Sequence, residues 1–184
     1  MKLVPNPLSL TVLVVVALIA IRTDSPAAEN RILLDDGIKA RLMALTPLRR
    51  NGISADAFDG RPVLVTFFAS WCPPCYAEFG ELGKFIKDRG AGKIAVISVN
   101  WQETYGGTDR KLARMLKRTI HPSIDVVRGN RATARDFDGV HSIPAAYLFD
   151  GKGNEIFRVS GDPGPPGRHH LNRGQLERAL GLNN

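Results

Sequence analysis

Cysteine is scarce in this chain, and its scarcity limits the chemistry that the chain can support. The 184 residues include two cysteines and four histidines. At most one disulfide can form within the chain, so the fold is not a small scaffold held together by several disulfides. A structural zinc site would need two ligands besides the cysteines, and the histidines have no spacing that supplies them. We therefore expect no metal and no other cofactor.

Long basic stretches and aromatic-rich segments are lacking as well. The formal net charge is +7, but the lysines and arginines are scattered, and aromatic residues make up 7% of the chain. Nucleic-acid-binding surfaces combine a basic stripe with aromatic side chains, so we expect no nucleic-acid partner and interpret the charge as a solvated surface. With 43% hydrophobic residues, the chain is long enough to bury a core of its own.

One apolar run is present near the N-terminus, from Leu8 to Ile21. As a helix it would measure about 21 Å, shorter than the hydrocarbon core of about 30 Å, which favours a signal peptide cut after Ala27. Counting from Leu3 instead gives 19 residues, which is enough for a membrane anchor. Residues 1–28 are thus a signal peptide or an anchor, and either one places the folded part outside the cytoplasm.

The rest of the chain divides into a linker and a folded domain. Residues 29–52 carry apolar side chains at helical spacing between Leu34 and Leu45, which predicts a short amphipathic helix. Whether this helix docks on the domain, on a partner or on the membrane stays open. Residues 53–184 are the expected folded domain.

The two cysteines, Cys72 and Cys75, lie together in the run Trp71–Cys75, which reads WCPPC. Residues 63–68 before it are β-branched and aromatic, which predicts a buried strand, and residues 74–87 after it have the apolar spacing of a helix. A bridge across two residues closes so small a loop that it stabilises the fold little. A redox switch is therefore the favoured interpretation, and a structural disulfide is the alternative.

The spacing assigns different roles to the two cysteines. Cysteine reacts as its thiolate, and the N–H groups and dipole at a helix N-terminus stabilise that anion. Cys72 is thus the predicted nucleophile. Cys75, one turn into the helix, would be more buried and would attack the mixed disulfide. Trp71 would cover the site, and Tyr76 excludes haem attachment, which needs a histidine directly after the second cysteine.

The run Phe68–Phe79, FASWCPPCYAEF, resembles the active site of the thioredoxin superfamily, and more narrowly of its TlpA/ResA-like branch of exported, often membrane-tethered reductants. The run Gly139–Asp150, GVHSIPAAYLFD, is similar to the cis-proline segment of that branch and the strand that follows it. The resemblance covers residues from about Asp59 to Gly161. It implies an α/β thioredoxin fold with a central mixed β-sheet flanked by helices, and a strand-helix insertion before the cis-proline.

Apolar spacing and turn residues predict the other helices, strands and loops of the domain. In the branch, the insertion helps to select the partner protein. We predict a strand at 93–100, a helix at about 109–117, an extended segment at 123–127, a hairpin turn at 150–154, a last strand at 155–160, a loop at 161–170 and a closing helix at 173–180.

The resemblance also implies which residues act. Thr66 stands where cytoplasmic thioredoxins carry a buried aspartate, so Glu78 becomes the candidate proton acceptor, with an exposed helix glutamate as the alternative. A cis bond before Pro144 would expose backbone that pairs with an extended substrate segment, with an ordinary trans proline as the alternative. The implied catalytic residues are Cys72, Cys75, Glu78 and Pro144, and the implied substrate contacts are Trp71, Pro73, Pro74 and Ile143.

In function, the resemblance implies reduction of disulfides in exported proteins, with apocytochrome c as the commonest client of the branch and an upstream membrane electron donor. The expected location is periplasmic or otherwise extracytoplasmic, either soluble after signal cleavage or anchored to the inner membrane. Two alternatives stay open: a disulfide oxidase or isomerase, and a non-catalytic binding module with a structural disulfide. The reduction potential separates these functions, and it depends on how strongly the Cys72 thiolate is stabilised.

Overall fold

The computed structural model describes residues 31–49, 52–160 and 170–182. The predicted signal or anchor segment, residues 1–28, lies outside these ranges, and so does most of the predicted loop at 161–170. Within the described residues, no helix is long and apolar enough to cross a membrane.

Six strands form one mixed β-sheet in the order β1-β4-β3-β2-β5-β6. The central strand is β2 (Val63–Phe68), and all six of its side chains are buried, because a β-branched and aromatic run suits a strand that is covered on both faces. It pairs in parallel with β3 (Ala95–Asn100) and antiparallel with β5 (Ala145–Phe149). The outer strands are β4 (Asp125–Arg128), β1 (Thr46–Pro47) and β6 (Glu155–Val159).

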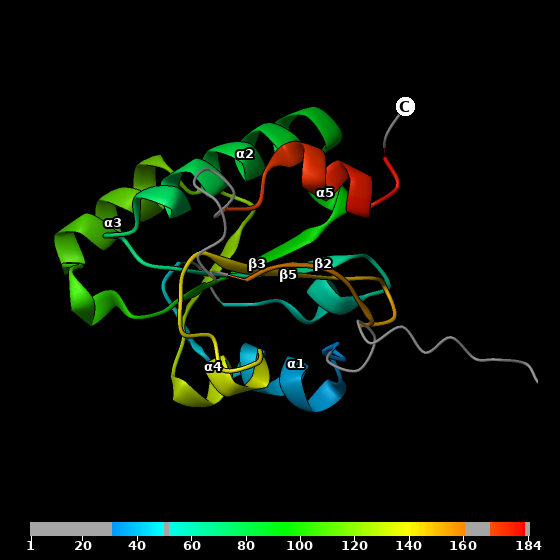
Figure 1. The fold of residues 1–184 in the computed structure, drawn as a ribbon, viewed down its shortest axis with the longest axis horizontal. Helices are drawn as coiled ribbons and strands as arrows, with labels where there is room; N and C mark the ends of the chain where they lie inside the picture. The colour runs from blue at the N-terminus through cyan, green and yellow to red at the C-terminus, as the bar shows by residue number, and fades with distance from the viewer. Residues whose placement is uncertain (1–30, 50–51, 161–169, 183–184) are drawn as a thin grey trace, which may run out of the picture. The chain divides into compact units, whose positions relative to one another are not determined.

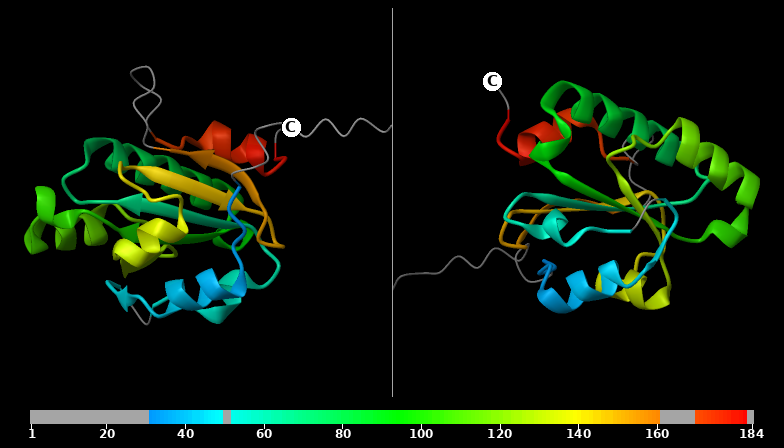
Figure 2. Two further views of the ribbon diagram at one scale, coloured as in Figure 1. Left: turned by 60° about the horizontal axis from the view of Figure 1, so that its bottom comes forward. Right: turned by 180° about the vertical axis from the view of Figure 1, so that it is seen from behind.

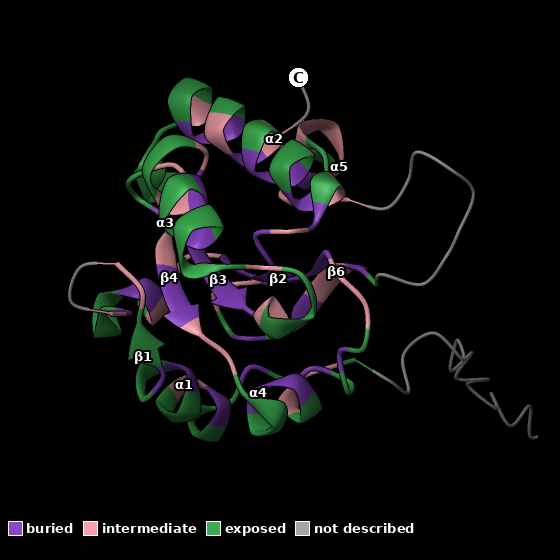
Figure 3. Cartoon of the chain, turned by 90° about the vertical axis from the view of Figure 1, so that its left-hand side faces the viewer, coloured by how far each residue is buried: buried purple, intermediate pink, exposed green. Residues whose placement is uncertain are grey.

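Helices cover both faces of the sheet, as Figures 1 and 2 show. One face is covered by α2, α3 and α5, and the opposite face by α1 and α4. The buried side chains accordingly form two apolar clusters, one on each face; Figure 3 colours the buried parts of the chain purple. The cluster beneath α2, hereafter the α2-side cluster, contains both cysteines. The helices are α1 (Asp36–Met43), α2 (Pro73–Arg89), α3 (Asp109–Arg118), α4 (Arg131–Asp136) and α5 (Arg173–Ala179), with short 3-10 helices at Ala55–Phe58, Ala91–Lys93 and Glu103–Tyr105.

The helix that follows the cysteines, α2, confirms the prediction made from its apolar spacing. Phe79, Leu82, Phe85 and Ile86 are all buried, so the helix packs one apolar stripe against the sheet. Burial of each such side chain is worth about 1.5–3 kcal/mol. The helix ends at Gly90, whose φ of 90° lies in a region that only glycine adopts readily.

The N-terminal helix α1 docks on the folded domain, a point that the sequence left open. Its first turn is capped by Asp35, whose carboxylate accepts the Ile38 N–H at 2.7 Å. Ile38 and Leu42 are buried together with Leu34 in the cluster on the face opposite α2. Residues 34–45 therefore contribute to the core.

The segment between the cysteines and β5 contains the predicted strand, helix and extended stretch, which are confirmed as β3, α3 and β4. The last strand and the closing helix are confirmed as β6 and α5. The sequence did not predict α4, because its six residues have no apolar repeat from which a helix can be inferred. The local signal is instead a cap: Asn130 accepts the Thr133 N–H at 3.0 Å.

Candidate active site

Cys72 and Cys75 form a disulfide at the N-terminus of α2, with their Cα atoms 5.4 Å apart. The position follows from the fold, because β2 ends four residues before Cys72 and delivers the pair to the carboxyl end of the central strand. Cys72 is 2% exposed and Cys75 is 1% exposed. Burial alone therefore does not distinguish the two sulfurs in the disulfide form, contrary to the expectation that Cys75 is clearly the more buried.

The backbone does distinguish them. Cys72 is the N-cap residue of α2, and the Cys75 N–H donates to its Sγ at an N–S distance of 3.3 Å. The first helical turn normally offers several free N–H groups, but Pro73 and Pro74 have none. Stabilisation of a Cys72 thiolate thus depends on the Cys75 N–H and on the helix dipole.

We expect Cys72 to be alkylated at least about tenfold faster than Cys75 in the reduced protein near pH 7, because only Cys72 receives this stabilisation. The measurement is mass spectrometry of peptides after short exposures to iodoacetamide. The reduced protein unfolded in guanidinium serves as the control, since its two thiols should react at similar rates. Equal rates in the folded protein would contradict the assignment of Cys72 as the nucleophile.

Glu78 lies one turn of α2 beyond Cys75 and is buried, with 1% of its surface exposed, so the alternative of an exposed helix glutamate is wrong. The Thr66 hydroxyl donates to one carboxylate oxygen, and the Leu171 N–H donates to the other at 3.0 Å. These two hydrogen bonds lower the pKa, but desolvation outweighs them and raises the pKa of Glu78 to about 7. The carboxyl can therefore both accept and release a proton near neutral pH.

The contact with Leu171 is one that sequence reasoning missed. It joins residues that are 93 positions apart, and no local pattern signals such a pair. A second bond repeats the arrangement one turn later, where Glu81 accepts the Arg173 N–H at 3.2 Å. Two glutamates of α2 thus hold the segment that leads into α5.

The remaining predicted site residues differ in how far they are buried. The peptide bond between Ile143 and Pro144 is cis, and Pro144 is buried. Ile143 and Trp71 are partly buried and pack against the α2-side cluster, the cluster that holds both cysteines. Pro73 is exposed and Pro74 is half-buried. Their contact with a substrate stays a prediction.

The segment after β3 connects the two loops of the site, and the sequence did not point to it. The indole N–H of Trp71 donates to the Gln102 carbonyl at 2.8 Å. On the other side, the Trp101 indole donates to the Val140 carbonyl and the Gln102 amide donates to the His141 carbonyl, both at 3.1 Å. Gln102 has a φ of 57°, which is uncommon for a residue with a side chain. The cysteine loop and the cis-proline loop are therefore held to one another through residues 101 and 102.

Glu103, which sequence reasoning also missed, holds Ser70, the residue directly before Trp71. Its carboxylate accepts the Ser70 N–H at 2.9 Å, the Ser70 hydroxyl and the Asn100 side-chain amide at 2.7 Å. A Cβ atom at Gly107 would lie 2.6 Å from the backbone carbonyl oxygen of Glu103, which is too close for a residue with a side chain. A signal existed, because polar residues directly after a parallel strand lie at the edge of the sheet where sites form.

The chemistry available to this arrangement is exchange of the disulfide with external thiols. A disulfide sulfur is opened by an attacking thiolate, and the reduced pair can open another disulfide in the same way. Among the described residues, no group of three or more His, Cys, Asp and Glu side chains could hold a metal ion.

Comparison with known proteins places the chain in a family. The Redoxin family matches residues 36–167. The "Thiol:disulfide interchange protein DsbE" of Yersinia pestis is 30% identical over 169 residues, with 88% of this chain and 85% of that protein covered. The protein of the same name from Haemophilus influenzae is 30% identical, but the match spans 56% of this chain and 53% of that protein. The crystal structure of a thioredoxin-like protein from Aeropyrum pernix has the same fold, with a TM-score of 0.58, 19% identity, and 80% and 93% of the two chains covered.

Proposed function

The chain belongs to the Redoxin family and is a thiol-disulfide oxidoreductase, and we propose from this premise that it reduces disulfides in exported proteins through Cys72 and Cys75. The observation that carries the proposal is the buried carboxyl of Glu78, one turn beyond Cys75, with its pKa raised to about 7; the reducing direction is taken from the resemblance to exported reductants. A reductase must remove a proton from its second thiol in every cycle. A base that titrates near neutral pH suits that step.

In the first step, the Cys72 thiolate attacks one sulfur of the client disulfide. The client S–S bond breaks, a bond forms between Cys72 Sγ and one client sulfur, and the other client sulfur leaves as a thiolate. The Cys75 N–H and the helix dipole stabilise the attacking anion before the step. Resemblance to the cis-proline segment of the TlpA/ResA-like branch supports an extended client segment held by strand addition next to Pro144.

In the second step, Glu78 accepts the proton of Cys75, and the Cys75 thiolate attacks Cys72 Sγ. The Cys72–Cys75 disulfide forms, and the second client sulfur leaves as a thiolate, so the client gains two electrons and the enzyme loses them. Residues three apart on a helix have Cβ atoms about 5–6 Å apart, which places the carboxyl on the same helix face as the thiol. A dithiol donor must then reduce the pair again.

The client and the location complete the proposal. Resemblance to exported reductants of the TlpA/ResA-like branch supports a role in cytochrome c maturation, with apocytochrome c as client and a membrane protein as electron donor. The relatives named thiol:disulfide interchange proteins support partners that exchange thiols and disulfides with this chain. We propose that residues 1–28 export the chain or anchor it to the inner membrane, and that residues 53–184 carry the activity outside the cytoplasm.

A trapping experiment tests the proposal. In Cys75→Ser the second attack is lost, so the mixed disulfide between Cys72 and the client is expected to accumulate. The measurement is non-reducing electrophoresis of the exported fraction, followed by mass spectrometry of the trapped species. The double variant Cys72→Ser with Cys75→Ser is the control, because it has no thiol that can form the adduct.

The trapped partners separate a catalytic cysteine pair from a structural disulfide. Capture of apocytochrome c or of another exported protein with a disulfide supports the reductase. If Cys72→Ser traps clients and Cys75→Ser does not, the order of the two thiols is reversed. If neither variant traps a client and the wild-type protein does not turn over a small disulfide, the bridge is a structural disulfide in a binding module.

A further inference from the structure

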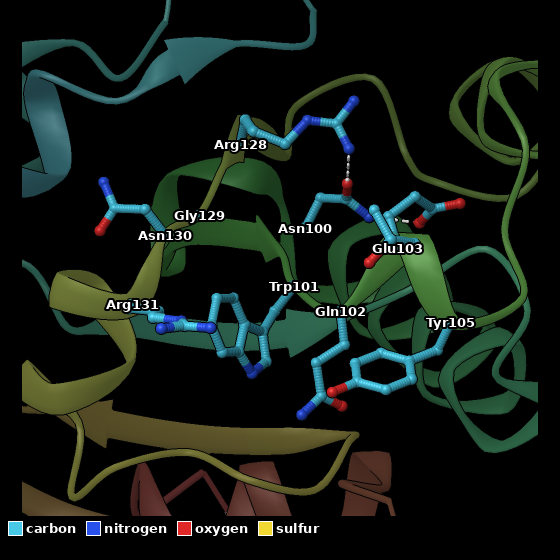
Figure 4. A pocket seen from close by; sticks show the side chains of 10 residues that line it. Asn100, Trp101, Gln102, Glu103, Tyr105, Arg128, Gly129, Asn130 and Arg131 are labelled. Atoms are coloured by element: carbon cyan, nitrogen blue, oxygen red, sulfur yellow. Dashed lines mark hydrogen bonds between the residues drawn. The ribbon is translucent and has the colours of Figure 1, made fainter.

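A cavity of about 450 Å³ lies beside the redox site, in the loops that follow β3 and β4 (Figure 4). In α/β sheets, ligands bind outside the carboxyl ends of parallel strands, because the loops there bring polar groups together. We refer to this cavity as the strand-end pocket. The lining residues that carry the inference are Trp101, Gln102, Glu103, Tyr105, Arg128 and Arg131.

The strand-end pocket shares a wall with the redox site. Gln102 lines the pocket and accepts the Trp71 indole N–H at 2.8 Å, and Glu103 lines it and accepts the Ser70 N–H at 2.9 Å. Ser70 and Trp71 are the two residues directly before Cys72. A polypeptide whose disulfide reaches Cys72 advances about 3.3 Å per extended residue. The side chains that neighbour the client disulfide are thus the ones that would meet this shared wall.

Two guanidinium groups set the charge of the pocket. Arg128 uses one of its N–H groups to bond the Asn100 side-chain oxygen, and a guanidinium has five such donors. Within the described part of the chain, the Arg131 side chain has no hydrogen bond or ion pair. Glu103 is the acidic residue of the lining, but Ser70 and Asn100 already donate three hydrogen bonds to its carboxylate.

The lining also offers aromatic surface. Tyr105 is 79% exposed, which is unusual for a large aromatic side chain in a folded domain. Figure 4 shows it on the other side of the pocket from Arg131, with Trp101 between them in this view. Aromatic side chains together with arginines are typical of surfaces that bind polypeptides.

We propose that the strand-end pocket binds an acidic side chain of the client protein, close to the disulfide that is being reduced. The inference rests on the proposed reductase function and adds to it a preference among clients. Arg131 is the main contact, because its fork of N–H donors matches a carboxylate and has no other partner to give up among the residues that the structure describes. Arg128 supports it with its remaining donors.

The test compares two synthetic peptides, each with one intramolecular disulfide, flanked by glutamates in one and by glutamines in the other. The reduced full chain reacts with each in a stopped-flow instrument, and the second-order rate constant is measured at low and high salt. We expect the glutamate peptide to react up to about fivefold faster at low salt, the upper end of what one exposed ion pair contributes. In Arg131→Gln this advantage is lost, and in Arg131→Lys it partly returns.

Arg135→Gln is the matched control, because Arg135 is an exposed arginine of the same helix that does not line the pocket. It should keep the full preference. Equal rates of the two peptides with the wild-type chain, or equal losses in Arg131→Gln and Arg135→Gln, would overturn the inference. Either result leaves the reductase function intact.

A binding measurement keeps the two proposals distinguishable. Serine replaces both cysteines in the glutamate and glutamine peptides, and the fluorescence of Trp71 and Trp101 reports binding to the oxidised chain. Stronger binding of the glutamate peptide that requires Arg131 supports the pocket even if neither disulfide peptide is reduced, in which case the reductase function fails. If inorganic phosphate competes with both peptides and the chain binds both equally well, the pocket is a site for small anions. That result would overturn the inference.

Discussion

Replacing Glu78 with glutamine is expected to slow reduction of a protein disulfide about 100-fold at pH 7, the loss usual when a general base is removed. Glutamine keeps the size of the side chain and can bond both present partners, but it cannot take the proton of Cys75. The first attack by Cys72 does not need that proton transfer. Stopped-flow measurement should therefore show the mixed disulfide forming at nearly the wild-type rate and decaying slowly.

The pH dependence separates a proton acceptor from a merely structural residue. Hydroxide takes the place of a missing general base as the pH rises, so the defect of the variant should shrink toward pH 9. Glu81→Gln is the matched control, because Glu81 lies on the same helix and also bonds the segment that leads into α5. A defect that stays the same from pH 6 to pH 9, or one shared by Glu81→Gln, would count against Glu78 as the base.

The parts of the fold that could be predicted are those with a local cause. The run of residues in β2 is apolar and β-branched, and the stripe from Phe79 to Ile86 has helical spacing, so each element follows from its own sequence. The cysteine pair could be placed on a helix N-terminus because strand, turn and helix are contiguous. The turn at Asp150 also has a local cause, because the Asp150 carboxylate accepts the Asn154 N–H at 2.8 Å.

The parts that could not be predicted depend on contacts between distant segments. The burial of Glu78 follows from Leu171, and the position of Ser70 follows from Glu103, 33 residues later in the chain. A glutamate on a helix and a glutamate in a loop are most often exposed, so local composition favours the solvated state for both, and only the resemblance to the TlpA/ResA-like branch marks Glu78 as a site residue. Only the packing of α5 and of the segment after β3 makes them part of the site.

The buried carboxyl also has a consequence for stability. In the oxidised chain the pKa of Glu78 is raised from 4.5 to about 7, so between these values the folded protein binds a proton that the unfolded protein has released. The free energy of unfolding must then fall as the pH rises through this window. The full penalty, about 3 kcal/mol for a shift of this size, is reached above pH 7 and is absent below pH 4.5.

In Glu78→Gln this slope should disappear, so the variant should gain up to about 3 kcal/mol over the wild type between pH 5 and pH 8. The amide oxygen can accept the Leu171 N–H, and the amide nitrogen can donate to the Thr66 hydroxyl, so no buried polar group loses its partner. Urea unfolding of the oxidised proteins at pH 5, 6, 7 and 8 measures the difference.

Between pH 5 and pH 8, the other carboxyls with shifted pKa values do not change the free energy of unfolding. Hydrogen bonds lower the pKa values of Glu81, Asp150 and Glu177 below their ordinary values, so their contribution to stability is complete above about pH 5 and is lost only in acid. The pKa of Tyr147 is raised to about 12 by burial, so it does not titrate in the window.

A wild-type protein whose stability is constant from pH 5 to pH 8 would show that Glu78 stays ionised in the folded state. It would then be a permanent anion near the thiols and a poor acceptor for the proton of Cys75.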